Sequence, residues 1–507
     1  MPEARHSGFN LARHCLAETA RRLPDKVALY VATDASGVPA ETWTFARLEE
    51  AVLKGAGGLA RLGLERGDRV LLRLGNTSDF PLFFFGAIAG GFVPIPTSTM
   101  LTRAEADVVL ADSGARLVVA RDPALLPHDT PGVIVLHAAE VADVEHAAPI
   151  AYADTRADDP AFLVYTSGTS GRPKGVLHAQ RVILGRRPMH AGWYGLGESD
   201  ILLHAGAFNW TYTLGAGLMD PWSLGATSIV YAGDKDPTIW PRLVEAYGAT
   251  LFAAVPSLYR QILKYAEIAP DRMPTLRHGL TAGEALHPAL HAEWMTRSGR
   301  PLFEALGMSE ISTYISSSPA TPTRPGSPGR PQPGRRVAIL PAEGGTEPLG
   351  PGETGVIAVH GSDPGLMLGY WNRPEDTAAV FRGDWFVTGD LARLDDDGYL
   401  WFEGRSDDLM NTFGYRVAPQ EVEAAIAAHP AVADVAVTDV RVDDMVRIIA
   451  AFVVVHDGAK LDDAELDAWC AERLAAYKRP RRFVRVKVLP RTQSGKVMRR
   501  SLSDGIA

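Results

Sequence analysis

The sequence has little cysteine: Cys15 and Cys470 are its only two among 507 residues. They lie far apart and form no C-x-x-C pattern, so the sequence supports neither a disulfide framework nor a cysteine zinc site. We therefore expect a reduced, cytoplasmic protein.

Uninterrupted apolar runs are also lacking. The amino terminus interrupts its apolar residues with charge every few positions, unlike a signal peptide. Residues 80–102 are uncharged, but Pro81, Gly90 and Pro94 break the run, whereas a membrane span needs about 20 apolar residues in one helix. The pattern predicts a short buried helix followed by a turn, and no integral membrane span.

Positive charge is in the minority, with 51 Lys and Arg against 60 Asp and Glu and a formal net charge of -9. A protein held on nucleic acid by its global charge is therefore disfavoured. The hydrophobic share of 46% and the charged share of 22% are those of an ordinary globular protein.

Strand-like and helix-like stretches alternate over most of the chain, which predicts α/β architecture with β/α-layered sheets. Residues 391–405 are typical of a hairpin that turns at Asp397-Gly398. A different pattern follows, with helices expected at 419–428 and 462–476. Strands are expected at 432–438, 448–455 and 483–488. We predict a large N-terminal domain of several subdomains over 1–405 and a small α+β domain over 406–507.

The strongest chemical signal is YTSGTSGRPKGV at residues 165–176, directly after the apolar strand AFLVY. Hydroxyls, small residues that expose backbone N–H groups, and a lysine suit a polyphosphate. Gly175 follows Lys174, so the loop is not a Walker A motif. We call this segment the Ser/Gly loop. The alternative is that it is only a flexible linker, but flexible linkers rarely lie directly against a buried strand.

Two other patterns indicate neither a dinucleotide site nor a metal site. The G-x-G-x-x-G at residues 350–355 precedes a strand, whereas a dinucleotide site needs it between a strand and a helix, so a turn is predicted. His287 and His291 are four apart but have Pro288 between them and no acid in H-E-x-x-H position, which disfavours a metal pair.

Short motifs accompany the Ser/Gly loop in a fixed order along the chain. They are TAGEAL at 281–286, LGMSE at 306–310, GYWN at 369–372, TGD at 388–390, GRSDD at 404–408, GYR at 414–416 and PRTQSGK at 490–496. Together they resemble the signature series of the adenylate-forming (AMP-binding) superfamily, from about Trp43 to Leu502. Within this superfamily, the order of the segments is most similar to that of benzoate-CoA ligase and medium-chain acyl-CoA ligases.

The resemblance implies an ATP-dependent acid:CoA ligase that forms an acyl adenylate and then an acyl-CoA, with ATP, Mg²⁺ and CoA. Attack on the α-phosphate brings anions together, so positive charge and a metal are needed. We expect an aromatic, alicyclic or medium-chain acid as substrate, and no nucleic-acid partner. Loading of a carrier protein is the alternative, and a catalytically silent nucleotide-binding module is a third. A homodimer stays open.

Phosphate and metal contacts follow from the resemblance. Lys174, Glu310 and Lys496 are the implied catalytic residues. Glu310 would bind Mg²⁺, with Ser309 near the α-phosphate, and Lys496 would stabilise charge on the carboxylate and α-phosphate. The β- and γ-phosphates would be held by Lys174 and by Thr166, Ser167, Gly168 and Thr169.

The resemblance also implies a nucleoside pocket. Asp390 would accept both ribose hydroxyls, Arg405 would help to fix the ribose, and Arg416 would meet a phosphate. Adenine would be lined by Gly283, Glu284, Ala285, Glu304 and Leu306. Leu306 stands where the family often has an aromatic residue, so apolar packing would replace stacking, and Glu304 would reach the adenine amine.

The family's small C-terminal domain rotates between the two half-reactions, and the hinge maps to Asp407. Gly414 and Tyr415 would then line the tunnel for the CoA thiol. Residues 478–500 hold ten Lys or Arg and no acid. Two interpretations stay open: a solvated basic strand face, or a surface that meets ATP in one domain arrangement and CoA in the other.

The acid pocket of the family corresponds here to the segment after residue 207 and to residues after Glu310. It would include Phe208, Asn209, Trp210, Tyr212 and Thr313. Asn209 stands where activators of α-amino acids place an aspartate, so an amino-acid substrate is disfavoured. The pattern favours a mostly apolar pocket with a few hydroxyls, and the alternative is that these aromatic residues belong to the core.

Overall fold

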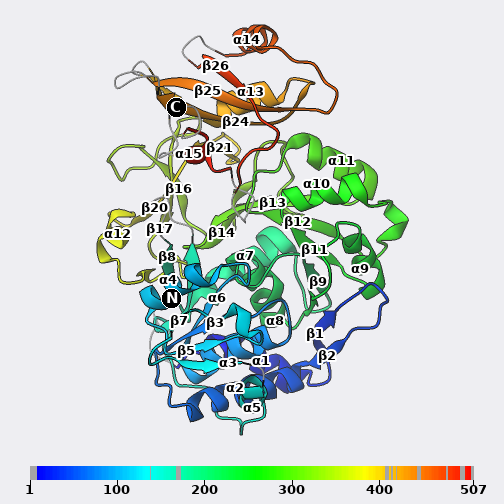
Figure 1. Ribbon diagram of the computed structural model, residues 1–507, viewed down its shortest axis with the longest axis vertical. Helices are drawn as coiled ribbons and strands as arrows, with labels where there is room; N and C mark the ends of the chain where they lie inside the picture. Colours follow the sequence, from blue (N-terminus) through cyan, green and yellow to red (C-terminus); the bar gives the residue numbers. More distant parts are fainter. Residues whose placement is uncertain are drawn as a thin grey trace. The chain divides into compact units, whose positions relative to one another are not determined.

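The computed structural model describes residues 8–128, 130–137, 139–166, 173–405, 410–412, 415–417, 419–441, 447–474, 478–491 and 497–503. The chain forms two compact units (Figure 1). The first comprises residues 1–336 and 360–381, and the second comprises residues 337–359 and 382–507. The boundary after residue 405 stays a prediction, and the hinge residue Asp407 lies outside the described residues.

The first unit is built on a nine-stranded sheet, in the order β15-β14-β13-β12-β11-β9-β10-β1-β2. Strands β1, β10, β9, β11, β12 and β13 run parallel, and all of them except β13 are largely buried. Antiparallel strands complete both edges. The strands are β1 (Val27–Ala32), β2 (Glu41–Thr44), β9 (Ile201–His204), β10 (Thr227–Tyr231), β11 (Leu251–Ala254), β12 (His278–Ala282), β13 (Leu302–Met308), β14 (Ser312–Ser316) and β15 (Arg330–Pro331).

Two smaller sheets complete this unit. A parallel sheet has the order β4-β3-β5-β6. An antiparallel sheet has the order β18-β8-β7, and the Ser/Gly loop connects β7 to β8. Their strands are β3 (Arg69–Leu72), β4 (Val93–Pro96), β5 (Leu117–Val119), β6 (Ile134–Leu136), β7 (Pro160–Thr166), β8 (Lys174–Ala179) and β18 (Gly369–Tyr370).

Helices pack around these sheets (Figure 1). They are α1 (Leu11–Arg22), α2 (Phe45–Arg61), α3 (Asp79–Gly90), α4 (Arg103–Ser113), α5 (Ala139–Glu145), α6 (Val182–Met189), α7 (Thr211–Leu214), α8 (Asp220–Ser223), α9 (Ile239–Tyr247), α10 (Pro256–Tyr265), α11 (Pro288–Ser298) and α12 (Pro374–Ala379). Short 3₁₀ or π turns lie at Pro123–Leu125, His190–Tyr194, Gly215–Met219 and Pro270–Arg272.

The apolar run at 80–102 forms a helix, a turn and a strand. Helix α3 is buried almost throughout and ends at Gly91, whose φ of 80° suits glycine. Strand β4 continues from Val93 and is buried at every residue. The predicted buried helix is confirmed, and none of the described helices is long and apolar enough to span a membrane.

The second unit contains the predicted α+β pattern. Its sheets have the orders β16-β17-β20-β19, with β21 on β20, then β22-β23 and β24-β25-β26. The strands are β16 (Val337–Leu340), β17 (Gly355–His360), β19 (Phe381–Arg382), β20 (Trp385–Leu394), β21 (Leu400–Arg405), β22 (Met410–Thr412), β23 (Tyr415–Val417), β24 (Val432–Arg441), β25 (Arg447–Val455) and β26 (Arg482–Arg485), and the helices are α13 (Pro419–Ala427), α14 (Asp463–Ala471) and α15 (Arg499–Ser503).

Several local predictions are confirmed. Strands β20 and β21 form the expected hairpin, with Gly398 at φ 77° in its turn. Residues 350–355 form a turn before β17, in which Gly350 N–H donates to Glu353. The two cysteines are buried free thiols. The α/β class, with a large and a smaller unit, agrees with the sequence.

Candidate active site

The ends of the Ser/Gly loop are fixed by strand pairing. Thr166 ends β7 and Lys174 begins β8, and the two residues face each other in the ladder. Ser167, Gly168 and Thr169 lie outside the described residues. Lys174 Nζ is 3.0 Å from a carboxylate oxygen of Asp376 on α12. It also lies 5.3 Å from the ring centroid of Tyr370, within range of a cation–π interaction.

Glu310 is buried in the short turn between β13 and β14. The Tyr370 hydroxyl donates to Glu310 Oε1 at 2.8 Å, and Met367 N–H donates to the Glu310 carbonyl oxygen at 2.8 Å. Tyr370 lies on β18, which pairs with β8 immediately after Lys174. The side chain of Tyr370 therefore contacts both implied catalytic residues of this unit.

Tyr370 received no role from the sequence, although its GYWN motif contributed to the resemblance. The motif shows that the residue belongs to the series, but its contacts depend on the pairing of β18 with β8. Such pairing joins segments far apart along the chain, so local periodicity carries no signal for it.

The donor set at Glu310 fits a divalent metal. A carboxylate oxygen is a hard ligand that Mg²⁺ accepts, and Mg²⁺ usually takes one or two protein carboxylates together with substrate phosphates. No group of three or more His, Cys, Asp or Glu in the described part of the chain could hold a metal ion. Glu310 therefore suits a metal shared with a nucleotide better than a cage made wholly of protein ligands.

The TAGEAL segment follows β12. Gly283 has φ 91°, and a Cβ there would lie 2.6 Å from the ring of Trp210, so glycine is required both for conformation and for space. The Glu284 carboxylate accepts hydrogen bonds from the backbone N–H and the hydroxyl of Ser257, at 3.1 and 2.9 Å. Ala285 is exposed. The Glu284 side chain is thus engaged by Ser257 of α10.

Glu304 connects this segment to the neighbouring strand. It lies on β13, and its Oε1 accepts from Leu286 N–H at 2.9 Å. Burial raises the pKa of Glu304 to about 7. Leu306 lies two residues along the same strand, half-buried, so the two side chains share a face. Four predicted adenine residues are therefore neighbours in this sheet region: Gly283 and Glu284 directly follow β12, and Glu304 and Leu306 lie on the adjacent β13.

The predicted acid-pocket residues divide between core and partly exposed positions. Phe208 is buried and stacks on Phe80 of α3, with 4.9 Å between centroids. Tyr212 is buried against Trp193 and His204, and its hydroxyl donates to the Leu280 carbonyl oxygen. Both residues pack in the core, the alternative that the sequence left open.

Two of the other predicted acid-pocket residues are more exposed to solvent. Asn209 and Trp210 are half-buried, and Trp210 covers Gly283 and meets Tyr212 edge to face. Thr313 is buried after the Glu310 turn, where its hydroxyl accepts from Gln332 Nε2 at 3.4 Å. Trp210 is thus the residue that joins the acid-pocket segment to the TAGEAL segment.

The TGD motif, which is predicted to bind ribose, lies in the second unit. Asp390 is buried on β20 beside Gly389, which has φ 77°. Its backbone N–H donates to the Thr388 hydroxyl, which in turn donates to the Ile357 carbonyl oxygen. Arg405 ends β21 opposite Asp390 in the ladder.

Apart from Ser309, the remaining predicted residues belong to the second unit as well. Tyr415 and Arg416 form part of β23, whereas Asp407, Gly414 and Lys496 lie outside the described residues. Ser309 is half-buried in the Glu310 turn of the first unit.

Family models match most of the chain. A model described as AMP-binding enzyme covers residues 16–371, and one described as AMP-binding enzyme C-terminal domain covers residues 421–496. Among curated proteins, the chain is similar to the benzoate–CoA ligase of Thauera aromatica, with 34% identity over 86% of each chain.

Solved structures agree in fold. ATP-bound MatB from Rhodopseudomonas palustris superposes with a TM-score of 0.90 at 28% identity, covering 98% of each chain. A benzoate CoA ligase from Burkholderia xenovorans LB400 superposes with a TM-score of 0.85 at 30% identity, covering 98% of this chain and all of that one.

Proposed function

Because the chain belongs to the family of AMP-binding enzymes, we propose that it converts an aromatic carboxylic acid to its CoA thioester through an acyl adenylate. The predicted reaction class is confirmed: the protein is an AMP-forming acid–CoA ligase with ATP and CoA as substrates. The aromatic substrate, the metal and the residue roles are the proposal.

The observation that carries the proposal is the contact of Tyr370 with both Lys174 and Glu310. A cation at the end of the Ser/Gly loop and a buried carboxylate share this neighbour. The cation would hold a triphosphate, and the carboxylate would hold a metal that neutralises phosphate charge. The arrangement suits transfer of AMP to a carboxylate with loss of pyrophosphate.

In the first step Lys174 holds the outer phosphates, and Glu310 holds the metal. Mg²⁺, when bound, neutralises phosphate charge and orients the pyrophosphate leaving group. Backbone groups of Gly283 and Glu284 bind adenine. The substrate carboxylate attacks the α-phosphate, and Lys496 stabilises the negative charge that both carry.

The second step needs a thiol at the same carbonyl carbon. The C-terminal domain turns about Asp407, and the Gly414 loop then lines the path of the CoA thiol. The thiol adds to the acyl carbon, and AMP departs with the oxygen that joined it to the acyl group. The family's alternative, loading of a carrier protein, has no supporting observation here.

An aromatic acid is favoured by the chemistry of Trp210, Asn209 and Thr313 and by the benzoate ligases that the chain resembles. Trp210 offers a ring face, and Thr313 and Asn209 offer polar groups. Asn209 carries no charge, so it cannot pair with an ammonium.

Acid-dependent exchange of labelled pyrophosphate into ATP tests the substrate class. The panel consists of benzoate, hydroxybenzoates, cyclohexanecarboxylate, hexanoate, acetate and phenylalanine. We expect the highest kcat/KM with a benzoate. Highest activity with acetate or hexanoate would contradict the aromatic assignment, and no exchange with any acid would favour a silent module.

A further inference from the structure

Two described non-glycine residues have positive φ, Ser312 at 73° and Asn372 at 53°. Each lies two residues after one partner of the Glu310–Tyr370 hydrogen bond. A left-handed conformation costs a residue such as serine about 1 to 2 kcal/mol, and such positions persist only where surrounding contacts hold them. Asparagine adopts this conformation readily, so the strained position is Ser312.

Ser312 closes the turn that carries Glu310. Strand β13 ends at Met308, which pairs with Ser312 at the start of β14, so Glu310 lies in the short connection between these paired residues. Ile311 N–H donates to the Met308 carbonyl oxygen at 3.3 Å. The Ser312 backbone therefore helps to define the turn that carries the Glu310 carboxylate.

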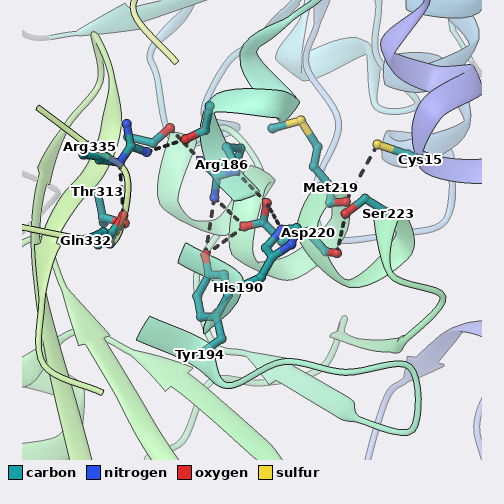
Figure 2. Close-up of polar contacts among 12 residues, drawn as sticks. Cys15, Arg186, His190, Tyr194, Met219, Asp220, Ser223, Thr313, Gln332 and Arg335 are labelled. Atoms are coloured by element: carbon teal, nitrogen blue, oxygen red, sulfur yellow. Dashed lines mark hydrogen bonds and ion pairs between the residues drawn. The ribbon is translucent and has the colours of Figure 1, made fainter. Parts of the chain in front are cut away.

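Arg186 of α6 contacts the Ser312 side chain. Its Nη1 donates to Ser312 Oγ at 2.6 Å. The guanidinium is itself fixed, because Nε and Nη2 donate to the two carboxylate oxygens of Asp220 at 2.8 and 2.6 Å (Figure 2). Tyr194 donates to the same carboxylate at 2.8 Å. This bidentate ion pair fixes the orientation in which the guanidinium contacts Ser312.

A second arginine fixes the neighbouring residues. Arg335 donates to the carbonyl oxygen of Gly185, beside Arg186, and pairs with Asp363 at 2.8 Å. Its Nε donates to Gln332 Oε1, and Gln332 Nε2 reaches Thr313 (Figure 2). Helix α6 is thus linked to Ser312 by one arginine and to Thr313 through the other.

Stability alone does not account for this arrangement. Arg186 and Asp220 have side-chain exposures of 3% and 0%, and a buried ion pair is often no more stabilising than apolar residues of the same volume. The left-handed Ser312 is unfavourable too. Both features converge on the turn of Glu310.

We propose that Arg186 is a positioning residue, which acts through Ser312 to hold the Glu310 carboxylate where the metal of the metal–ATP complex meets it. This inference rests on the metal role proposed for Glu310. Arg186 itself touches neither the nucleotide nor the acid.

The test is Ser312→Ala, which removes the acceptor and keeps a side chain at the left-handed position. ATP affinity is measured by calorimetry with saturating Mg²⁺ and again in EDTA. We expect the Mg²⁺-dependent gain in ATP affinity to fall about 5-fold. This loss is smaller than the full contribution of a hydrogen bond to a charged group, because Ser312 acts on the metal site indirectly. The affinity in EDTA stays that of the wild type.

Tyr194→Phe is the matched control. It removes a donor from the same Asp220 carboxylate and the acceptor of a 3.4 Å hydrogen bond from Arg186 Nη2, but keeps the bidentate Arg186–Asp220 pair and the contact of Arg186 with Ser312. We expect a lower melting temperature with an unchanged Mg²⁺ effect. Arg186→Lys keeps the positive charge beside Asp220 but loses the paired guanidinium donors. In that background, Ser312→Ala should cause no further loss of the Mg²⁺-dependent gain in ATP affinity.

The outcomes separate the two claims. If wild-type protein binds ATP more tightly with Mg²⁺ and Ser312→Ala does so equally, the positioning role is wrong while the proposed function stands. An equal loss in Tyr194→Phe would assign the network a structural role only. If Mg²⁺ fails to raise the ATP affinity of wild-type protein, the proposed role of Glu310 is wrong and this inference is overturned with it.

Discussion

The phenol of Tyr370 donates a hydrogen bond to Glu310 Oε1 at 2.8 Å, and its ring lies 5.3 Å from the Lys174 ammonium. The lysine comes from the Ser/Gly loop and the glutamate from the LGMSE motif, the two strongest phosphate and metal signals in the sequence. Tyr370 thus links the group that suits phosphate to the group that suits a metal.

Tyr370→Phe should lower kcat/KM for acid-dependent pyrophosphate exchange about 10-fold, because a hydrogen bond to a charged group contributes about 1.5 kcal/mol or more. The ring that faces Lys174 is kept, so the effect reports the hydroxyl alone. The measurement is the exchange rate as a function of Mg²⁺ concentration. If the variant shows the same profile as the wild type, the Tyr370 hydroxyl has no role in the site.

Asp376→Asn should lower the KM for ATP about 2- to 5-fold, because the Asp376 carboxylate competes with phosphate for Lys174. An ion pair of this exposure contributes at most about 1 kcal/mol, and the gain should shrink at high salt because ions screen it. Glu375→Gln on the same helix is the control with the same change in charge. Equal effects from both variants would indicate general electrostatics instead of the Lys174 contact.

Glu304→Gln should change how stability depends on pH. Burial raises the folded-state pKa of Glu304 to about 7 from the ordinary value of 4.5. The folded protein therefore binds the proton more tightly, and the contribution of Glu304 is full below pH 4.5 and is lost as pH rises through 7. Urea denaturation from pH 5 to 8 should show wild-type protein losing roughly 2 kcal/mol relative to Glu304→Gln. Parallel pH profiles would contradict the raised pKa.

Lys496→Ala should abolish most acid-dependent exchange, with a loss of about 100-fold or more, because it removes a cation from developing charge. The thioester step from supplied acyl adenylate and CoA should continue at a similar rate. Lys487→Ala, in the same basic segment, is the control and should leave both steps near wild type. Equal loss of both steps in Lys496→Ala would contradict its assignment to adenylation.

Gly414→Leu should have the opposite effect, because a side chain there would obstruct the thiol. Pyrophosphate exchange should stay at the wild-type rate, while the KM for CoA rises or turnover with CoA falls. CoA kinetics equal to those of the wild type would contradict the tunnel assignment.

Much of the fold was predictable where the signal is local. The apolar run at 80–102 is broken by proline and glycine, and it forms the buried α3, a turn and β4. The Asp397-Gly398 dipeptide gave the β20–β21 hairpin, because a glycine at φ 77° fits its turn. The Ser/Gly loop connects the paired strands β7 and β8 and follows a buried apolar strand, as its sequence indicates.

Long-range contacts were not predictable in the same way. Phe208 belongs to the core because it stacks on Phe80, more than 100 residues earlier in the chain. Trp210 covers Gly283, and Arg186 reaches Ser312, through contacts between elements that no periodicity relates. The motif series identified which residues belong to the site, whereas the side chains that hold them became apparent only in the folded chain.

The most direct test of the central claim is the fate of the carboxylate oxygens. The protein is supplied with ATP, CoA, Mg²⁺ and benzoate, or the best acid of the panel, labelled with ¹⁸O in both carboxylate oxygens. An acyl-adenylate route predicts AMP that carries a single ¹⁸O and unlabelled pyrophosphate, since the oxygen that attacks the α-phosphate leaves with AMP. Label in inorganic phosphate or pyrophosphate, or AMP without label, would contradict the account.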